Sequence, residues 1–236
     1  MIVKLRKLAL NGINWYFDQY IGGEKRAARY DISDNCPELL IFDQNYEKIL
    51  KEYEYVDQHY QLQAYHDTDS AQYTISAMVE PNKKWKIFVL SLCGETPELA
   101  LKLCPQTCKM LESIPNVYQA FFSVLEPGKP VPAHNGPYRG ILRYHLGLKI
   151  PAQNPPSIRI KDQIYFWQDG KSFLFDDTWE HEVFNNAKED RIVLIVDIYR
   201  PMPPFQNKVN SFLIKKVIKT LYADKVVKNL KNEKKE

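Results

Sequence analysis

The sequence is poor in cysteine and has no long hydrophobic run. It contains four cysteines in 236 residues, and the closest pair, Cys104 and Cys108, is separated by three residues instead of the two that are typical of redox and zinc-knuckle motifs. This pattern predicts partly buried free thiols in a reducing compartment rather than a disulfide framework. No apolar stretch is long enough to span a membrane, and the first residues lack the hydrophobic region and cleavage site of a signal peptide.

A dominant charge of one sign is also missing. The chain carries 32 lysines and arginines against 29 aspartates and glutamates, which gives a formal net charge of +3. Because acidic and basic residues are mixed over most of the chain, we expect no nucleic-acid partner. The exception is the lysine-rich stretch 208–236. The absence of an N-x-S/T sequon adds to the features that predict a cytoplasmic protein.

Helical patterns precede the β-rich part of the chain. We expect helices in four segments: 1–30, from Asn45 to about Gln61, 97–102 and 107–113. Asn45 is a suitable cap for the second of them. Residues 62–80 are polar and aromatic without a firm period, which makes them a candidate flap or loop on the substrate side.

The middle of the chain has the period of β-strands. Trp85 begins a strand rich in aromatic and β-branched residues. Five alternating apolar segments follow it, separated by Gly, Pro, Asn and Asp: 117–125, 140–150, 157–167, 171–176 and 190–199. This spacing predicts a mainly β fold with flanking helices, arranged as a sandwich or a jelly-roll barrel.

These patterns divide the chain into three regions. Residues 1–80 are expected to form a helical and irregular region packed on the core, 81–204 the β domain, and 205–236 a basic C-terminal helix capped by Asn210 or Ser211. The C-terminal helix has two interpretations. Either it packs on the domain with its lysines in solvent, or it contacts an anionic membrane surface.

Histidines and arginines gather in the β region. His134 and His181 each have an ordinary reading as polar residues near strand ends, but two neutral imidazoles across a barrel mouth form a site for a divalent metal. Arg143 and His145 share one face of their strand, and Arg191 lies in another apolar strand. Because arginine is rarely buried unpaired, we expect a pocket that binds an anion beside a metal.

Several motifs resemble those of a known family. In chain order they are Pro105-Gln-Thr-Cys108, Phe122-Ser-Val-Leu-Glu-Pro-Gly128, His134-Asn-Gly-Pro137, Leu142-Arg-Tyr-His-Leu-Gly-Leu148, Phe175-Asp-Asp177, Glu180-His-Glu-Val183 and Arg191. Their order and spacing resemble the aspartyl/asparaginyl β-hydroxylase family of iron(II)- and 2-oxoglutarate-dependent oxygenases. That resemblance implies a double-stranded β-helix core of the jelly-roll, cupin-like kind, and it covers about half of the chain, from Trp85 to Pro201.

The resemblance implies a metal site with two protein ligands. His134 and His181 occupy the positions of the iron ligands. Related oxygenases carry a carboxylate ligand two residues after the first histidine. This chain has Gly136 there, as the resembled family has glycine.

The resemblance also implies how 2-oxoglutarate is bound. Arg191 matches the arginine that binds the far carboxylate of the cosubstrate, with help from Ser123. Arg143 and His145 match the pair near its other end, and Trp85 matches a tryptophan that lines the pocket.

Structural alternatives remain for the arginines. Arg143 has the alternative of a salt bridge to an acidic residue elsewhere, and Arg191 the alternative of an ion pair with Asp176 or Asp177. The two aspartates are also candidates for orienting a ligating imidazole.

The activity implied is hydroxylation of an unactivated C–H bond, with O2 and 2-oxoglutarate as partners. The first hypothesis is an Asp/Asn-type side chain of a protein or peptide as substrate. Ile141 favours a second hypothesis, a fatty-acyl or lipid A-type substrate at a membrane surface, because the peptide-hydroxylating members carry a basic residue at this position. A third is an inactive jelly-roll binding module. We expect specificity to reside in residues 31–80.

Overall fold

Two antiparallel sheets form the centre of the protein. The computed structural model describes residues 2–69 and 72–223. The major sheet has seven strands in the order β1 (Arg29–Tyr30), β9 (Ser172–Phe175), β6 (Ile141–Lys149), β11 (Arg191–Tyr199), β4 (Val117–Leu125), β3 (Trp85–Leu92) and β2 (Gln63–Ala64). The minor sheet has four, in the order β5 (Val131–His134), β10 (His181–Phe184), β7 (Ser157–Ile160) and β8 (Gln163–Phe166).

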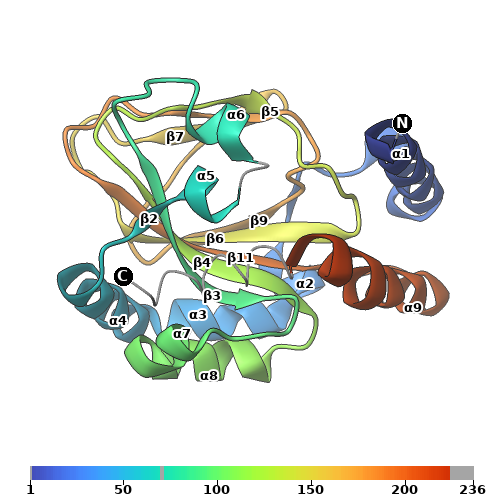
Figure 1. Cartoon of the computed structure of the whole chain (residues 1–236), viewed down its shortest axis with the longest axis horizontal. Coiled ribbons are helices and arrows are strands. Elements are labelled where there is room, and N and C mark those ends of the chain that lie inside the picture. Colours follow the sequence, from blue (N-terminus) through green and yellow to red (C-terminus); the bar gives the residue numbers. More distant parts are fainter. Residues whose placement is uncertain (1, 70–71, 224–236) are drawn as a thin grey trace.

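Helices cover the outer face of the major sheet and flank its ends. In chain order the α-helices are α1 (Ile2–Ile21), α2 (Ile32–Asn35), α3 (Leu40–Gln44), α4 (Tyr46–His59), α5 (Tyr65–Thr68), α6 (Tyr73–Ser76), α7 (Glu98–Leu103), α8 (Pro105–Ser113) and α9 (Pro204–Phe212). Short 3-10 segments, η1 (Gly23–Lys25) and η2 (Pro37–Leu39), join the early helices, and a π-helical segment, η4 (Leu213–Ala223), follows α9. Helices α3, α4, α7 and α8 lie below the major sheet, and the minor sheet lies above it (Figure 1). The expected fold class is confirmed: a mainly β, jelly-roll core with flanking helices.

Because side chains alternate along each strand, the two faces of the major sheet contribute to two different hydrophobic clusters, one on the side of the helices and one between the sheets. In β6, Leu142, Tyr144 and Leu146 face the helices and belong to the larger cluster. Arg143 and His145 face the space between the sheets, as the alternation predicts. Tyr144 donates a hydrogen bond to Asp43 at 2.8 Å, so the outward face of β6 is tied to α3.

The expected strands and helices differ from the observed ones in a few places. The segment 157–167 is a hairpin of two strands, β7 and β8, rather than one strand. Asn45 precedes α4 but its side chain donates to the carbonyl of Ile41 instead of capping the helix. The last helix begins at Pro204, and Asn210 lies buried inside it, where its side chain bonds to Gly140 and Tyr138. Both expected side-chain caps are therefore wrong.

The N-terminal region supplies part of the barrel. Its two short strands, β1 and β2, form the edges of the major sheet, and α4 packs Ile49, Tyr53 and Val56 into the larger cluster. The boundaries expected at residues 80 and 204 stay predictions.

One glutamate connects α4 to α8. The buried Glu52 accepts hydrogen bonds from the backbone N–H groups of Gln106 and Thr107, both at 2.8 Å, and from the Thr107 hydroxyl at 2.6 Å. These bonds satisfy free N–H groups in the first turn of α8, where a carboxylate is also favoured by the helix dipole. The Pro105-Gln-Thr motif thus serves to start a helix.

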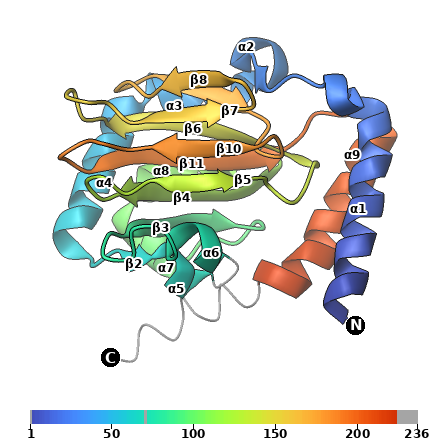
Figure 2. The same ribbon diagram turned by 90° about the horizontal axis from the view of Figure 1, so that it is seen from above.

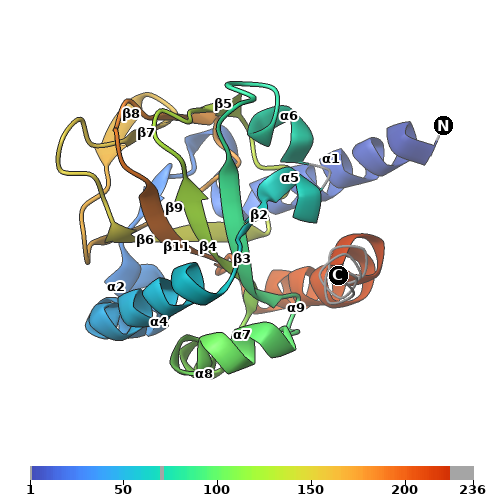
Figure 3. The same cartoon turned by 60° about the vertical axis from the view of Figure 1, so that its left-hand side comes forward.

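The first and last helices lie on the same side of the barrel (Figure 2). Phe17 of α1 and Ile214 of η4 are fully buried in a third cluster that also includes Ile141 and Tyr138. Figure 3 shows both helices extending away from the sheets. No helix within residues 2–69 and 72–223 has the length and apolar character needed to cross a membrane. The residues expected to continue the basic helix beyond Ala223 lie outside the described part of the chain.

Candidate active site

The minor sheet brings the two candidate metal ligands together. His134 ends β5 and His181 begins β10, and the two residues are direct partners in the antiparallel pairing of these strands. Their ring centroids are 4.1 Å apart. Sequence periodicity does not indicate either strand, because each has only four residues.

Both imidazoles are held in the tautomer that a metal ligand needs. His134 Nδ1 lies 2.8 Å from the carbonyl oxygen of Pro132, and His181 Nδ1 lies 2.9 Å from that of Trp179. Because a carbonyl only accepts hydrogen bonds, each Nδ1 carries the proton and each Nε2 keeps a free lone pair. Burial lowers the pKa of His134, and burial with the adjacent His134 ring lowers that of His181 to about 3. Two neutral imidazoles, of which His181 is buried and His134 partly buried, fit a divalent metal.

Position 136, where related oxygenases carry a third metal ligand, has no room for a side chain. A Cβ atom at Gly136 would lie 2.5 Å from Cγ of Asp177, so this carboxylate fills the space of a side chain at position 136. Asp177 is buried, and its Oδ1 has no hydrogen-bond partner among the described residues. The described residues contain no group of three or more His, Cys, Asp or Glu side chains that could hold a metal. The described residues therefore offer two candidate ligands, His134 and His181, with Asp177 beside them.

The imidazoles are not oriented by the aspartates. The backbone carbonyls of Pro132 and Trp179 take that role. Asp176 instead accepts a hydrogen bond from Arg26 Nε at 2.8 Å, and its Oδ2 atom lies 2.7 Å from Arg200 Nη2. One carboxylate therefore pairs with an arginine that precedes the first strand of the major sheet and with one that follows its last strand in the sequence. The expected orientation of a ligating imidazole by Asp176 or Asp177 is therefore corrected.

Arg191 is a buried guanidinium that has no counter-ion in the described part of the chain. It is 2 % exposed and has no acidic partner among the described residues, so the alternative ion pair with Asp176 or Asp177 is not observed. Its Nη2 contacts the Ser123 hydroxyl oxygen at 3.4 Å, and its Nε has no described partner. Burial lowers its pKa to about 9. A fixed cation in such surroundings is suited to bind a carboxylate.

Trp85 and Ser123 complete this anion site. The Trp85 indole donates to Ser123 Oγ at 2.9 Å. Because that oxygen already accepts, the Ser123 hydroxyl proton is available for an anion held by Arg191.

His145 is a second donor in the same pocket. Its Nδ1 accepts a 3.2 Å bond from the Trp167 indole, so its proton lies on Nε2. That atom is buried and has no described partner. Burial, with Arg143, Arg191 and His181 close by, lowers the pKa of His145 well below its usual value, which keeps the ring a neutral donor.

Arg143 has a protein partner. It donates to both oxygens of Asp197, at 2.7 and 2.8 Å, and lies 3.5 Å from Asp177. Burial alone would lower its pKa, but the Asp197 and Asp177 carboxylates outweigh this effect and raise it. The alternative expected for Arg143, a salt bridge to an acidic residue elsewhere, is thus observed.

Two residues of this site, Trp167 and Asp197, were not predicted from the sequence. Trp167 orients His145 and its ring lies 4.9 Å from the Arg191 guanidinium carbon. Asp197 pairs with Arg143 and also accepts from Gln119 at 2.6 Å. The signal for Asp197 is its place inside an apolar strand, since a buried carboxylate needs a partner. For Trp167 the sequence offers no comparable signal.

The sequence matches a known protein family. The family model for aspartyl/asparaginyl β-hydroxylase matches residues 43–201. An ornithine lipid ester-linked acyl 2-hydroxylase of Rhizobium tropici is 38% identical over 172 residues, covering 72% of this chain and 60% of that protein. The human aspartyl/asparaginyl β-hydroxylase is 38% identical over 122 residues, covering 50% of this chain and 16% of that protein.

The chain thus spans less than two thirds of the length of these two relatives. Among solved structures, a Pseudomonas putida prolyl-4-hydroxylase aligns over 67% of this chain and 88% of its own, with 15% identity and a TM-score of 0.45. The family match covers every strand of the two sheets except β1, and all the candidate metal- and anion-binding side chains described above. The chain therefore belongs to the aspartyl/asparaginyl β-hydroxylase family.

Proposed function

We propose that this protein is an iron(II)- and 2-oxoglutarate-dependent hydroxylase of a fatty-acyl chain in a membrane lipid. One observation carries the cofactor part of the proposal. A continuous row of ring contacts links the neutral imidazoles of His134 and His181 to Arg191, a buried guanidinium that has no acidic partner among the described residues. This combination suits a metal next to a carboxylate.

Each pocket residue then has a defined task. His134 and His181 would hold iron(II) through Nε2. Arg191 and the Ser123 hydroxyl would bind the far carboxylate of 2-oxoglutarate, while Trp85 fixes Ser123 by its 2.9 Å hydrogen bond. His145 would donate from Nε2 to the end of the cosubstrate nearest the metal.

Bound iron(II) and 2-oxoglutarate supply the chemistry: O2 is consumed, 2-oxoglutarate becomes succinate and CO2, and one oxygen atom is inserted into a substrate C–H bond. The aromatic walls of Trp85, Trp167, Phe173 and Phe175 exclude water from the pocket, which suppresses side reactions.

The charge around Arg143 supports a substrate without a carboxylate at the reacting carbon. Both oxygens of Asp197 accept from Arg143, and Asp177 lies 3.5 Å away. An acidic substrate side chain would have to compete with these carboxylates for the guanidinium. Two residues earlier on the same strand face, Ile141 belongs to an apolar cluster with Phe17 and Ile214. An acyl chain suits these surroundings better than an Asp or Asn side chain does.

A membrane lipid also requires access to a membrane surface. On α9 and η4, Phe205 and Phe212 are 66% and 61% exposed, and Lys208, Lys215 and Lys216 are exposed beside them. Exposed aromatic and basic side chains on one helix suit contact with an anionic interface. We therefore propose a cytoplasmic protein that touches the membrane through this helical region.

The cofactor proposal is tested by anaerobic titration with iron(II) and 2-oxoglutarate. We expect a visible metal-to-ligand charge-transfer band that is lost in His134→Ala and weakened in Arg191→Gln. Arg159→Gln is the matched control, because Arg159 lies on the minor sheet and is paired with Glu180 and Glu182. A folded protein without the band would favour the inactive binding module.

The substrate is tested by the turnover of 2-oxoglutarate. We expect acyl lipids in detergent micelles to stimulate succinate formation, and mass spectrometry to detect an added oxygen atom on the acyl chain. Stimulation by Asp-containing or Asn-containing peptides, with no effect of lipids, would instead support the peptide hypothesis.

A further inference from the structure

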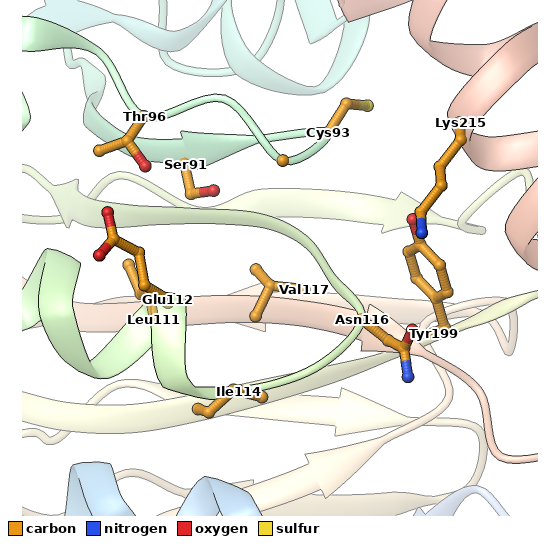
Figure 4. Close-up of a pocket in the computed structure, with 11 residues that line it drawn as sticks. Ser91, Cys93, Thr96, Leu111, Glu112, Ile114, Asn116, Val117, Tyr199 and Lys215 are labelled. Carbon is orange, nitrogen blue, oxygen red and sulfur yellow. The ribbon is translucent and has the colours of Figure 1, made fainter.

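A pocket of about 300 Å³ lies at the ends of three central strands, away from the histidines. Its walls come from the end of β3, the start of β4, the end of β11, α8 and η4 (Figure 4). Neither the cofactor assignment nor the family motifs include its residues.

The pocket carries one positive and one negative side chain. Glu112 belongs to α8 and Lys215 to η4, and they lie at opposite ends of the pocket (Figure 4). The two do not pair with each other, and neither has an ion-pair partner elsewhere in the described part of the chain. The neighbouring charges differ in this respect, because Glu95 is paired with Lys219 at 2.8 Å. Both charges of the pocket are thus available to a ligand.

Neutral polar groups lie between the charges. Ser91, Thr96, Asn116 and Tyr199 line the pocket from strand ends and turns (Figure 4). Burial raises the pKa of Tyr199 to about 12, so its phenol stays protonated and can donate a hydrogen bond. A ligand with a polar body and opposite charges at its two ends matches this arrangement.

Residues of the pocket lead toward Arg143 of the candidate active site. Tyr199 lies two residues after Asp197 on the same face of β11, which separates their Cα atoms by about 7 Å. Asp197 in turn holds Arg143. Ser91 also lines a second, smaller pocket together with Gln119, which donates to Asp197. A substrate seated here would reach toward the Arg143 end of the active site.

We propose that this pocket binds the zwitterionic, amino-acid-like headgroup of the lipid substrate, with Lys215 facing its carboxylate and Glu112 facing its ammonium group. The inference rests on the proposed acyl hydroxylation and names the class of lipid. A free amino-acid derivative presents the same chemistry, so the test separates the two sources.

The first arm of the test measures kinetics in neutral detergent micelles. Two lipids with the same acyl chains are compared, one with a headgroup that carries a carboxylate and an ammonium group and one with a purely anionic headgroup. We expect a lower KM for the zwitterionic lipid. Lys215→Gln and Glu112→Gln should each raise that KM about three- to fivefold and leave kcat unchanged, as expected for exposed charges. Lys51→Gln on α4, an exposed lysine outside both the pocket and the helical region proposed to touch the membrane, is the control and should change nothing.

The second arm measures binding without turnover. Nα-acetyl-L-ornithine carries one carboxylate and one ammonium group, and N-acetyl-L-norvaline lacks the ammonium group. In ligand-observed NMR of the full chain without metal, we expect the first to bind more tightly than the second. Glu112→Gln should abolish the difference.

The outcomes separate this inference from the proposed function. If lipids are hydroxylated but KM responds to neither headgroup nor variant, the headgroup assignment is wrong and acyl hydroxylation stands. If the ornithine derivative binds and no lipid is hydroxylated, the pocket serves a free amino-acid derivative and the lipid assignment is wrong.

Discussion

Arg191 and its surroundings connect ligand binding to stability. Its guanidinium is buried, contacts one hydroxyl and the face of Trp167, and has no described counter-ion. A buried charge without a partner is destabilising. A carboxylate bound at this arginine would therefore stabilise the folded protein as well as position the cosubstrate.

Arg191→Met should separate these two effects. Removal of the buried charge is expected to raise the free energy of unfolding by about 1 to 3 kcal/mol when 2-oxoglutarate is absent. We expect 2-oxoglutarate to increase the Tm of the natural sequence, and the same variant should lose this increase. Thermal unfolding with and without 2-oxoglutarate measures both. Arg159→Met should retain the ligand effect, and a variant Arg191→Met that keeps it would remove Arg191 from the anion site.

Gly136 shows how closely the metal-side loop is packed. Gly136→Ala places a Cβ atom 2.5 Å from the Asp177 carboxylate, which is closer than two such groups can approach. We expect the free energy of unfolding to fall by about 1 to 3 kcal/mol, as for other overpacked sites. In the Asp177→Ala background the same substitution should have little effect. Urea denaturation of the four proteins measures this coupling. If the free-energy losses of Gly136→Ala and Asp177→Ala simply add in the double variant, the loop around Gly136 adjusts to the extra methyl group and the two residues are not in tight contact.

For single residues, the alternation of apolar and polar positions in the sequence predicts which sheet face a side chain occupies, but not which side chain it contacts. Alternation along β6 correctly places Arg143 and His145 on the inner face. The partner of Arg143 is Asp197, 54 positions later, and this pairing depends on the register between β6 and β11. Trp167 directly follows β8, and its contacts with His145 and Arg191 likewise depend on the path that the chain takes from β8 back to the major sheet.

Elements of four residues limit what a sequence pattern can indicate. The long strands β4, β6 and β11 have enough alternating positions for prediction, whereas β5 and β10 have two positions on each face. These two short strands carry the candidate metal ligands. Sequence motifs identify the histidines, but the ladder that brings them together is a property of the fold.

Glu52 provides a test of how helices are tied to the barrel. Glu52→Gln keeps the size of the side chain but replaces one acceptor oxygen by an NH2 group, which cannot accept, so only one of the N–H groups of Gln106 and Thr107 keeps its partner. We expect a loss of about 1 to 3 kcal/mol in the free energy of unfolding. Urea denaturation measures the loss. Glu54→Gln, an exposed position on the same helix, is the control, and equal effects of both changes would contradict this role.

The molecule as a whole should lose stability in alkaline solution. Burial, as the main cause, raises the pKa of Cys36 and of Cys108 to about 12 from a usual value of 9.0. Above pH 9 the unfolded chain releases these protons while the folded chain retains them. Stability is therefore complete below pH 9 and falls as pH rises toward 12, by about 1.4 kcal/mol per pH unit for each thiol.

The measurement compares urea denaturation at pH 8 and pH 10.5. Cys36→Ala removes one of the thiols and should show a smaller decrease than the natural sequence. An unchanged pH dependence in Cys36→Ala would mean that this thiol ionises equally in both states.

The position of β11 has a consequence for biosynthesis. This strand lies in the middle of the major sheet, between β6 and β4, and it carries both Arg191 and Asp197. During translation the two halves of the sheet have no common partner until residue 199 has left the ribosome. Pairings between strands so distant in sequence also form slowly. The nascent chain thus exposes one edge of β4 and one edge of β6 until β11 has been made, and a chaperone that shields such edges would raise the yield of folded protein.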